Sequence, residues 1–260
     1  MRSLWTSWPV IERRILSQRK ILLLLDFDGT LVPIARTPHA VVLDKKIKLS
    51  LKRLCASISY QVVIISGRSL KDLLSYFKLP RVVYVGNHGL EIKGKELRIT
   101  HKAKKARKLE ALVRLLGQKL KEDLLNIPGL FIEDKNYTLS VHYRNISREY
   151  TPFFKQEITR FKKKHEHWPL IWKEGKKVWE VRPRVRWGKG DMALHLMKKM
   201  PGVLPIVIGD DVTDEDMFKV LKSRGITIRV GRSMKSAAQY FVKSPKEVGV
   251  LLQRLCDAKT

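Results

Sequence analysis

The sequence predicts an α/β protein with a doubly wound, Rossmann-like parallel-sheet core and an inserted α+β domain. Two observations predict the core: uninterrupted aliphatic runs end in polar residues, and amphipathic helical patterns separate these runs. A third observation predicts the insertion, because from about residue 102 the chain changes to helices followed by pairs of alternating strands. We expect residues 1–101 and 185–260 to form the core, and residues 102–184 to form the second domain.

Composition narrows the class of protein. The chain has 260 residues and is 44% hydrophobic, which is enough to bury a large core. Its 53 Lys and Arg against 25 Asp and Glu give a formal charge of +28, which attracts anions from phosphorylated sugars to nucleic acids. Because the basic residues are dispersed, a solvated basic surface explains them at least as well, and we expect no specific nucleic-acid partner.

The cysteines and the N-terminal stretch indicate where the protein acts. Cys55 and Cys256 lie in apolar helical patterns, which predicts buried thiols in a reducing compartment. Trp8 and Pro9 begin a short amphipathic helix, and this stretch has no apolar segment of the length of a signal peptide or a membrane span. We therefore expect a cytoplasmic monomer without a membrane partner.

The first predicted strand is the aliphatic run Ile21–Leu25, which is followed by Asp26, Asp28, Gly29 and Thr30. A turn or a helix cap would explain one of these acids, but not two acids at the end of so apolar a strand. Open α/β sheets bind ligands beyond the carboxyl ends of their strands. Asp26 and Asp28 are therefore candidates for binding a metal ion or a phosphate group.

The second predicted strand, Gln61–Ile65, follows a helical pattern over residues 45–58 and ends in Ser66, Gly67 and Arg68. A helical pattern over residues 70–77 comes next. A hydroxyl and free backbone N–H groups at a helix N-terminus can bind an anion. A plain helix cap at Ser66 is the alternative.

A third predicted strand, residues 81–85, leads into the turn Gly86–Gly89 and then into residues 90–92. The turn holds polar groups at the edge of the predicted sheet. Asn87 and His88 are candidate substrate contacts, although a histidine in a turn is more often structural.

The predicted second domain repeats a helix and two strands. The helical patterns cover residues 106–125 and 151–164, and the strands cover 130–136, 137–144, 170–173 and 178–181, with a Glu174-Gly175 turn before the last. Polar and apolar residues alternate in these strands. We expect an antiparallel sheet with helices on one face and polar side chains on the other.

The core pattern then returns. Lys189 begins a helical pattern, and the strand Pro205–Ile208 ends in Gly209, Asp210 and Asp211. Dipole and capping effects at the start of the next helix account for most of the acidic residues at 214–216. They do not account for Asp210 and Asp211, which stand at a strand end. The strand Ile226–Val230 and a helix over residues 246–255 complete the core.

These elements predict one site at the ends of adjacent strands, with Asp26, Asp28, Asp210 and Asp211 near Ser66 and Lys189. Oxygen ligands around a hydrated cation indicate Mg²⁺. An ionised carboxylate can attack phosphorus without first losing a proton. A second acid can protonate the leaving oxygen and later deprotonate water. The predicted chemistry is phosphoryl transfer through a carboxylate nucleophile, with positive groups on the phosphate oxygens.

The order of these motifs resembles a known superfamily. DFDGTL, the hydroxyl after the second strand, the lysine at a helix start and GDD resemble the haloacid dehalogenase superfamily. Within it, SGR, GNHGLEI, VWEVRP, WGKG and GDDVTDEDMF are similar to the trehalose-6-phosphate phosphatases over nearly the whole chain. The resemblance implies a haloacid dehalogenase-like core and a cap domain that sets substrate specificity.

The resemblance also implies roles for individual residues. Asp26 would be the nucleophile and Asp28 the acid/base, with Ser66 and Lys189 as phosphate ligands. Mg²⁺ would be held by Asp26, the carbonyl of Asp28 and Asp210, while Asp211 and Asp214 would orient metal-bound water and the lysine. The implied substrate contacts are Gly67, Arg68, Asn87 and His88 in the core, and Glu133, Lys135, Arg144 and Glu180 in the cap.

The resemblance implies a magnesium-dependent phosphatase that hydrolyses trehalose 6-phosphate to trehalose and phosphate through an aspartyl-phosphate, the last step of trehalose biosynthesis. One alternative is another sugar-phosphate phosphatase or a phosphomutase of the same superfamily. The alternative from a different class is a protein that binds polyanions or nucleic acid, which the charge of +28 allows.

Overall fold

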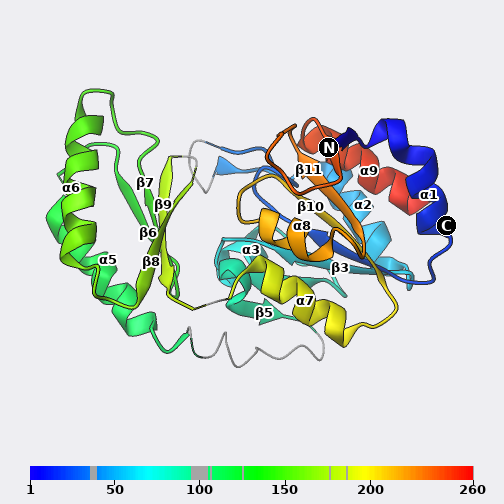
Figure 1. Cartoon of the computed structure of the whole chain (residues 1–260), viewed down its shortest axis with the longest axis horizontal. Helices are drawn as coiled ribbons and strands as arrows, with labels where there is room; N and C mark the ends of the chain where they lie inside the picture. Colours follow the sequence, from blue (N-terminus) through cyan, green and yellow to red (C-terminus); the bar gives the residue numbers. More distant parts are fainter. Residues whose placement is uncertain are drawn as a thin grey trace. The chain divides into compact units, whose positions relative to one another are not determined.

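The computed structural model describes residues 1–35, 40–94, 105, 107–124, 126–175, 177–185 and 187–259. The chain divides into two compact units (Figure 1): unit 1 is Met1–Arg98 with Trp187–Thr260, and unit 2 is Ile99–Arg186. The predicted boundary at residues 101 and 102 lies outside the described residues. The roles of core and cap that the sequence assigns to the two parts stay predictions.

Unit 1 is built on a mostly parallel sheet. Within the described residues it has eight strands in the order β1-β12-β11-β10-β2-β3-β4-β5, and only the β4–β5 pair is antiparallel. The strands are β1 (Arg2–Ser3), β2 (Ile21–Leu25), β3 (Tyr60–Ile65), β4 (Val83–Gly86), β5 (Glu91–Lys93), β10 (Leu204–Gly209), β11 (Ile226–Val230) and β12 (Tyr240–Val242). This topology confirms the predicted α/β fold.

Strand β2 lies between β10 and β3, and both of its faces are covered. Ile21, Leu23 and Leu25 belong to one apolar cluster, whereas Leu22 and Leu24 belong to another. The helices of the first cluster are α1 (Trp8–Leu16), α2 (Lys45–Ala56), α3 (Leu70–Tyr76) and α9 (Pro245–Asp257), and those of the second are α7 (Lys189–Lys199) and α8 (Glu215–Leu221). A strand that is buried on both faces needs an aliphatic residue at every position, which is why β2 has no alternation.

The short strands β1 and β12 at one end of the sheet were not predicted from the sequence. β1 has two residues and β12 has three, and they pair with each other at Arg2 and Tyr240. Segments this short carry no readable period, so they form because β11 offers backbone partners to β12, and β12 in turn offers them to β1. Unit 1 also contains the short 3₁₀ turns η1 (Trp5–Ser7) and η3 (Asn87–Gly89).

Unit 2 contains an antiparallel sheet of four described strands in the order β6-β7-β9-β8. The strands are β6 (Phe131–Asp134), β7 (Leu139–His142), β8 (Leu170–Gly175) and β9 (Val178–Pro183), and the helices are α5 (Glu110–Leu124) and α6 (Tyr150–Lys164). Both helices cover the same face of this sheet (Figure 1), where Leu139, Val141 and Val181 pack against Leu120 and Phe154.

Three predicted details of unit 2 are wrong or fall partly outside the described residues. Strand β8 continues through Gly175, which pairs with Val178, so the predicted Glu174-Gly175 turn is wrong. Strand β7 begins only at Leu139, because Asn136 has a φ of 68° and its N–H donates to the Asp134 carboxylate in a turn. The predicted helix over 106–125 begins as α5 at Glu110, and positions 106 and 125 lie outside the described residues.

Two further predictions concern the thiols and the membrane. Cys55 and Cys256 are buried and free, as predicted. Among the described residues, every helix is too short or too polar to cross a membrane.

Candidate active site

The predicted catalytic residues of unit 1 follow three neighbouring strands. Asp26 comes directly after β2, Ser66 directly after β3, and Asp210 directly after β10. These strands are parallel neighbours in the sheet, so the three residues lie at the same edge. The N–H of Asp26 continues the ladder by donating to the carbonyl of Ile208 at 2.9 Å. The structure therefore brings these residues to the carboxyl edge, where open α/β sheets bind ligands.

Lys189 lies between two buried carboxylates. Its Nζ donates to Asp26 Oδ1 at 2.7 Å and to Asp214 Oδ1 at 2.8 Å. Helix α7 begins at Lys189, and the N–H of the preceding Gly188 donates to the Asp191 carboxylate. The start of the helix therefore fixes the lysine backbone, and the two carboxylates fix its ammonium group.

Asp214 orders the loop after β10. Its Oδ2 accepts hydrogen bonds from the N–H groups of Asp210 at 2.9 Å and Asp211 at 3.0 Å. Its side chain makes no capping hydrogen bond to α8, so the capping explanation of this residue is wrong. Gly209 permits the arrangement, because a Cβ there would lie 2.4 Å from the Asp214 carboxyl carbon.

Three carboxylates at this edge fit a divalent cation. Asp26, Asp210 and Asp214 each offer one oxygen atom, and these atoms lie within 4.8 Å of one another. Asp26 Oδ2 is buried, and no described residue forms a hydrogen bond with it. An all-oxygen set with one uncompensated carboxylate oxygen suits a hard cation. The carboxylates of Asp28 and Asp211 are not part of this group, so their assignment to the metal stays a prediction.

Burial controls the charges around Lys189. Burial and then the negative charge of Asp214 raise the pKa of Asp26 well above its ordinary value, and the ammonium group of Lys189 opposes this only in part. Burial lowers the pKa of Lys189, but the two carboxylates outweigh that effect and raise it overall. The ammonium group therefore stays charged, and a cation beside Asp26 would favour its ionised form.

Asp28 makes a two-point contact with Arg68. The Arg68 Nε donates to one Asp28 oxygen and Nη2 to the other, both at 2.7 Å. Nη1 donates to the Asp72 carboxylate at 2.6 Å and to the Tyr76 hydroxyl at 2.9 Å. Burial lowers the pKa of Arg68, but Asp28 and Asp72 raise it above its ordinary value. The sequence predicted Arg68 as a substrate contact, whereas in unit 1 its guanidinium group binds these side chains.

The loops after β3 and β4 are joined by backbone hydrogen bonds. Ser66 Oγ accepts from the N–H of Arg68 at 3.1 Å, and the N–H of His88 donates to the Ser66 carbonyl at 3.0 Å. The N–H of Asn87 donates to the carbonyl of Arg68 at 2.7 Å. Asn87 and His88 are buried and have φ values of 47° and 54°. Gly67 lies between Ser66 and Arg68, so the predicted contacts of both loops belong to one hydrogen-bonded segment. Their contact with substrate stays a prediction.

In unit 2, the predicted residues Glu133 and Glu180 lie in one row across the sheet. The register pairs Glu133 with Ser140, Ser140 with Glu180, and Glu180 with Lys173. Alternation places this row on the face opposite the apolar cluster. The row also contains Lys173, which was not predicted as a site residue. Its alternation with the apolar Trp172 could have indicated that it lies on the polar face.

His142 is a second residue that sequence reasoning did not select. Its Nε2 lies 2.9 Å from Glu133 Oε2, and Lys135 Nζ lies 3.7 Å from the same oxygen. Its alternation with Val141 and Tyr143 could have indicated that it lies on the polar face, where it pairs with Phe131 of the neighbouring strand. The predicted contact Arg144 lies beyond the end of β7, in a turn, and is exposed, so its contact with the sugar stays a prediction.

Comparison with known proteins agrees with this geometry. The sequence model of the trehalose-phosphatase family matches residues 24–246, which span the strands and loops of the site. The chain belongs to the trehalose-phosphatase family. This confirms the resemblance and identifies the chain as an enzyme of the phosphatase class.

Individual members of the trehalose-phosphatase family are similar along most of the chain. A trehalose 6-phosphate phosphatase of Zea mays is 32% identical over 261 residues, covering 93% of this chain and 71% of the relative. Trehalose-phosphate phosphatase B of Arabidopsis thaliana is 30% identical over 260 residues, covering 93% and 67%.

Solved structures support the trehalose-phosphatase fold. The C-terminal domain of a Candida albicans trehalose-6-phosphate phosphatase has a TM-score of 0.81 at 24% identity and covers 96% of each chain. An Aspergillus fumigatus trehalose-6-phosphate phosphatase has a TM-score of 0.64 at 28% identity and covers 95% of this chain and 96% of that one.

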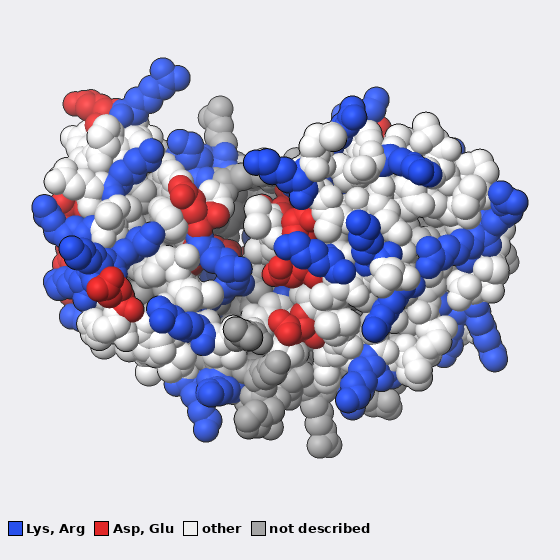
Figure 2. Space-filling view, viewed as in Figure 1, with Lys and Arg blue, Asp and Glu red and all other residues white. Residues whose placement is uncertain are grey.

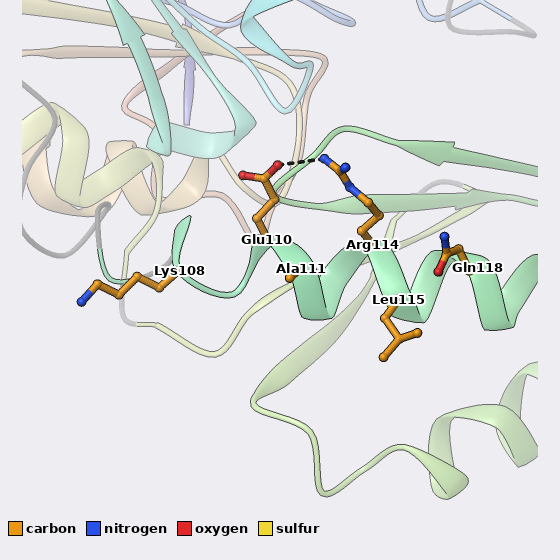
Figure 3. Close-up of a pocket in the computed structure, with 6 residues that line it drawn as sticks. All are labelled: Lys108, Glu110, Ala111, Arg114, Leu115 and Gln118. Carbon is orange, nitrogen blue, oxygen red and sulfur yellow. Dashed lines mark hydrogen bonds and ion pairs between the residues drawn. The ribbon is translucent and has the colours of Figure 1, made fainter.

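A pocket of about 430 Å³ lies elsewhere, along helix α5 of this trehalose-phosphatase. Figure 3 shows that its residues come from one stretch of chain and point in different directions, with an ion pair between Glu110 and Arg114 at 2.9 Å. Figure 2 shows Lys and Arg spread over the visible face. Neither feature brings polar groups together as the carboxyl edge of unit 1 does.

Proposed function

We propose that this member of the family is a Mg²⁺-dependent phosphatase that hydrolyses trehalose 6-phosphate to trehalose and phosphate, the last step of trehalose biosynthesis. One observation carries the proposal: Asp26 holds Oδ1 against Lys189 and keeps Oδ2 without a partner among the described residues. Such an oxygen suits a nucleophile. Family membership supports the substrate, because the similar plant proteins are named for it.

In the first step, an oxygen of Asp26 bonds to phosphorus while the bond from phosphorus to the sugar oxygen breaks. Asp28 gives its proton to the departing oxygen, so that the sugar leaves as a neutral alcohol. Lys189 and the Ser66 hydroxyl bind the phosphate oxygens, where negative charge is concentrated. The product on the enzyme is an aspartyl-phosphate at Asp26.

In the second step, Asp28 takes a proton from water, whose oxygen bonds to phosphorus as the bond to Asp26 breaks. Phosphate leaves, and Asp26 returns to its carboxylate form. Bound Mg²⁺, held by Asp26, Asp210 and the carbonyl of Asp28, would supply positive charge to the phosphate oxygens. Asp214 keeps Lys189 and the backbone of Asp210 in place through both steps.

Unit 2 would select the sugar. The row that contains Glu133 and Glu180, together with Lys135 and the exposed Arg144, supplies charged groups that can hydrogen-bond to sugar hydroxyls. A site built for hydroxyls rejects analogues without them, because its polar groups are then left unpaired.

The test is a phosphate-release screen over sugar phosphates with Mg²⁺, in which trehalose 6-phosphate should have the highest kcat/KM. Asp26→Asn should fold and lose at least about 10³-fold in kcat, because the amide cannot form an acyl phosphate. Mass spectrometry of wild-type enzyme quenched during turnover should find phosphate on Asp26. Substantial turnover by pure Asp26→Asn, or transfer of phosphate to a second sugar instead of water, would contradict the proposal.

A further inference from the structure

Arg68 is a buried arginine whose guanidinium group donates hydrogen bonds to Asp28 and to two side chains of helix α3. Its side chain is 6% exposed, whereas that of Asp28 is 39% exposed. Three of its nitrogen atoms donate hydrogen bonds: Nε and Nη2 to the two oxygens of Asp28, and Nη1 to Asp72 and Tyr76. We call this arrangement the clamp: Arg68 holds both oxygens of the Asp28 carboxylate, and that carboxylate is the more exposed of the two side chains.

The clamp is held on its other sides. The Arg68 guanidinium carbon lies 5.4 Å from the ring centre of Phe27 and 5.0 Å from that of Tyr76. Asp72 and Tyr76 both belong to helix α3, and the N–H of Asp72 donates to the Ser69 hydroxyl that caps this helix. The two aromatic rings and helix α3 therefore fix the plane of the guanidinium group. Because Nε and Nη2 bind both oxygens of Asp28, the plane of that carboxylate is fixed as well.

We propose that Arg68 is a positioning residue for Asp28. It donates one hydrogen bond to each carboxylate oxygen, and this orients the remaining lone pairs toward the leaving oxygen of the substrate. The inference rests on the proposed function, in which Asp28 is the acid and base. It replaces the substrate contact that the sequence predicted for Arg68. Arg68 touches neither substrate nor phosphate in this role.

The step remains balanced with this assignment. The proton moves from an Asp28 oxygen to the sugar oxygen while the bond from phosphorus to that oxygen breaks, and Arg68 keeps all of its protons. A protonated carboxyl group still has a carbonyl oxygen that accepts from Arg68, so the group stays oriented while it carries the proton.

Leaving groups distinguish positioning of an acid from general support of the fold. A sugar alkoxide needs a proton to leave, whereas a dinitrophenolate does not. The quantity kcat/KM covers the reaction only up to release of the alcohol, so hydrolysis of the aspartyl-phosphate does not affect it. The ratio of kcat/KM for two substrates is also independent of the fraction of enzyme that is folded.

The experiment compares wild type, Arg68→Lys, Arg68→Gln and Asp28→Asn on trehalose 6-phosphate and 2,4-dinitrophenyl phosphate. Lysine keeps the charge but cannot form the two-point contact. Arg68→Lys and Arg68→Gln should lower kcat/KM for the sugar phosphate by about 100-fold, and for the aryl phosphate by less than about threefold. Arg53→Lys, which changes an arginine of an exposed ion pair with Asp257, should leave the ratio unchanged.

Asp28→Asn separates this inference from the proposed function. It should show the same selective loss, and adding Arg68→Lys to it should lower kcat/KM for the sugar phosphate little further, because a clamp without an acid has nothing to position. If Asp28→Asn is selective and both Arg68 variants lose equally on the two substrates, or lose on neither, the inference is wrong and the proposed function stands. If Asp28→Asn itself shows no selectivity, Asp28 is not the acid and both are overturned.

Discussion

The charged groups around Lys189 in unit 1 and those around Glu133 in unit 2 are held in different ways. In unit 1, Lys189, Asp26 and Asp214 have side chains that are 3%, 6% and 0% exposed, and their ion pairs measure 2.7 and 2.8 Å. In unit 2, Glu133 and His142 are 15% and 25% exposed, and the contact between Lys135 and Glu133 is 3.7 Å.

The difference teaches which of the two groups is rigid. A buried charge that loses its partner costs several kcal/mol, so the arrangement around Lys189 has one stable geometry. A half-buried group can turn toward water at little cost, which suits a surface that meets many hydroxyl groups. In the proposed function, unit 1 would therefore fix the chemistry, and unit 2 would adapt to the sugar.

Removal of the metal should have the largest effect, because it acts on the rigid site. We expect EDTA to abolish phosphate release and added Mg²⁺ to restore it, since three carboxylates are grouped here and only two of them bind the ammonium group of Lys189 through a described hydrogen bond. Ca²⁺, which is larger and more flexible in its coordination, should inhibit. The measurement is initial rate against free metal concentration, and full activity in a metal-free preparation would contradict the prediction.

Asp214→Ala should lower stability more than any change on the sheet face of unit 2. The variant leaves Lys189 with one acidic partner and leaves two backbone N–H groups without their acceptor. We expect the free energy of unfolding to fall by about 3 kcal/mol. The Tm should fall by roughly 6–12 °C.

The control for this variant is Asp257→Ala, which breaks the exposed pair with Arg53. Its free energy of unfolding should change by less than about 1 kcal/mol. Equal Tm shifts in the two variants, measured by calorimetry, would show that burial does not set the difference between rigid and adaptable charges.

Glu180→Ala should have a smaller effect that is confined to the sugar. Removing one hydrogen-bonding partner of a hydroxyl costs about 2 kcal/mol, which is roughly 30-fold in kcat/KM for trehalose 6-phosphate. A small aryl phosphate offers no sugar hydroxyls, so its hydrolysis should change little. Parallel losses on both substrates would mean that Glu180 supports the rigid chemistry and not the choice of sugar.

Much of unit 1 was predictable, because its signals lie along the chain. The run Ile21–Leu25 matches β2, since a strand buried on both faces must be aliphatic throughout, and the predicted strand Ile226–Val230 matches β11. Asp26 and Lys189 were predicted to face each other, and they do, because a strand end and a helix start are both visible in the sequence.

The rest depends on contacts between distant segments. Asp28 and Arg68 are 40 positions apart, and nothing local shows that one binds the other instead of substrate. Asp72 lies four positions after Arg68, a spacing that could have indicated their ion pair. In unit 2, the predicted strand ran on to Arg144, whereas β7 ends at His142, because the alternation in the sequence continues past the end of the strand.

The position of β2 between β3 and β10 has a consequence during protein synthesis. Its partner β3 is complete by residue 65, but β10 begins only at Leu204, after the whole of unit 2 has been made. Until then one long edge of β2 has no backbone partner, and Asp26 has neither Lys189 nor Asp210 beside it. A chain emerging from the ribosome can therefore fold unit 2 first, and Asp26 acquires its surroundings only when the last quarter of the chain arrives.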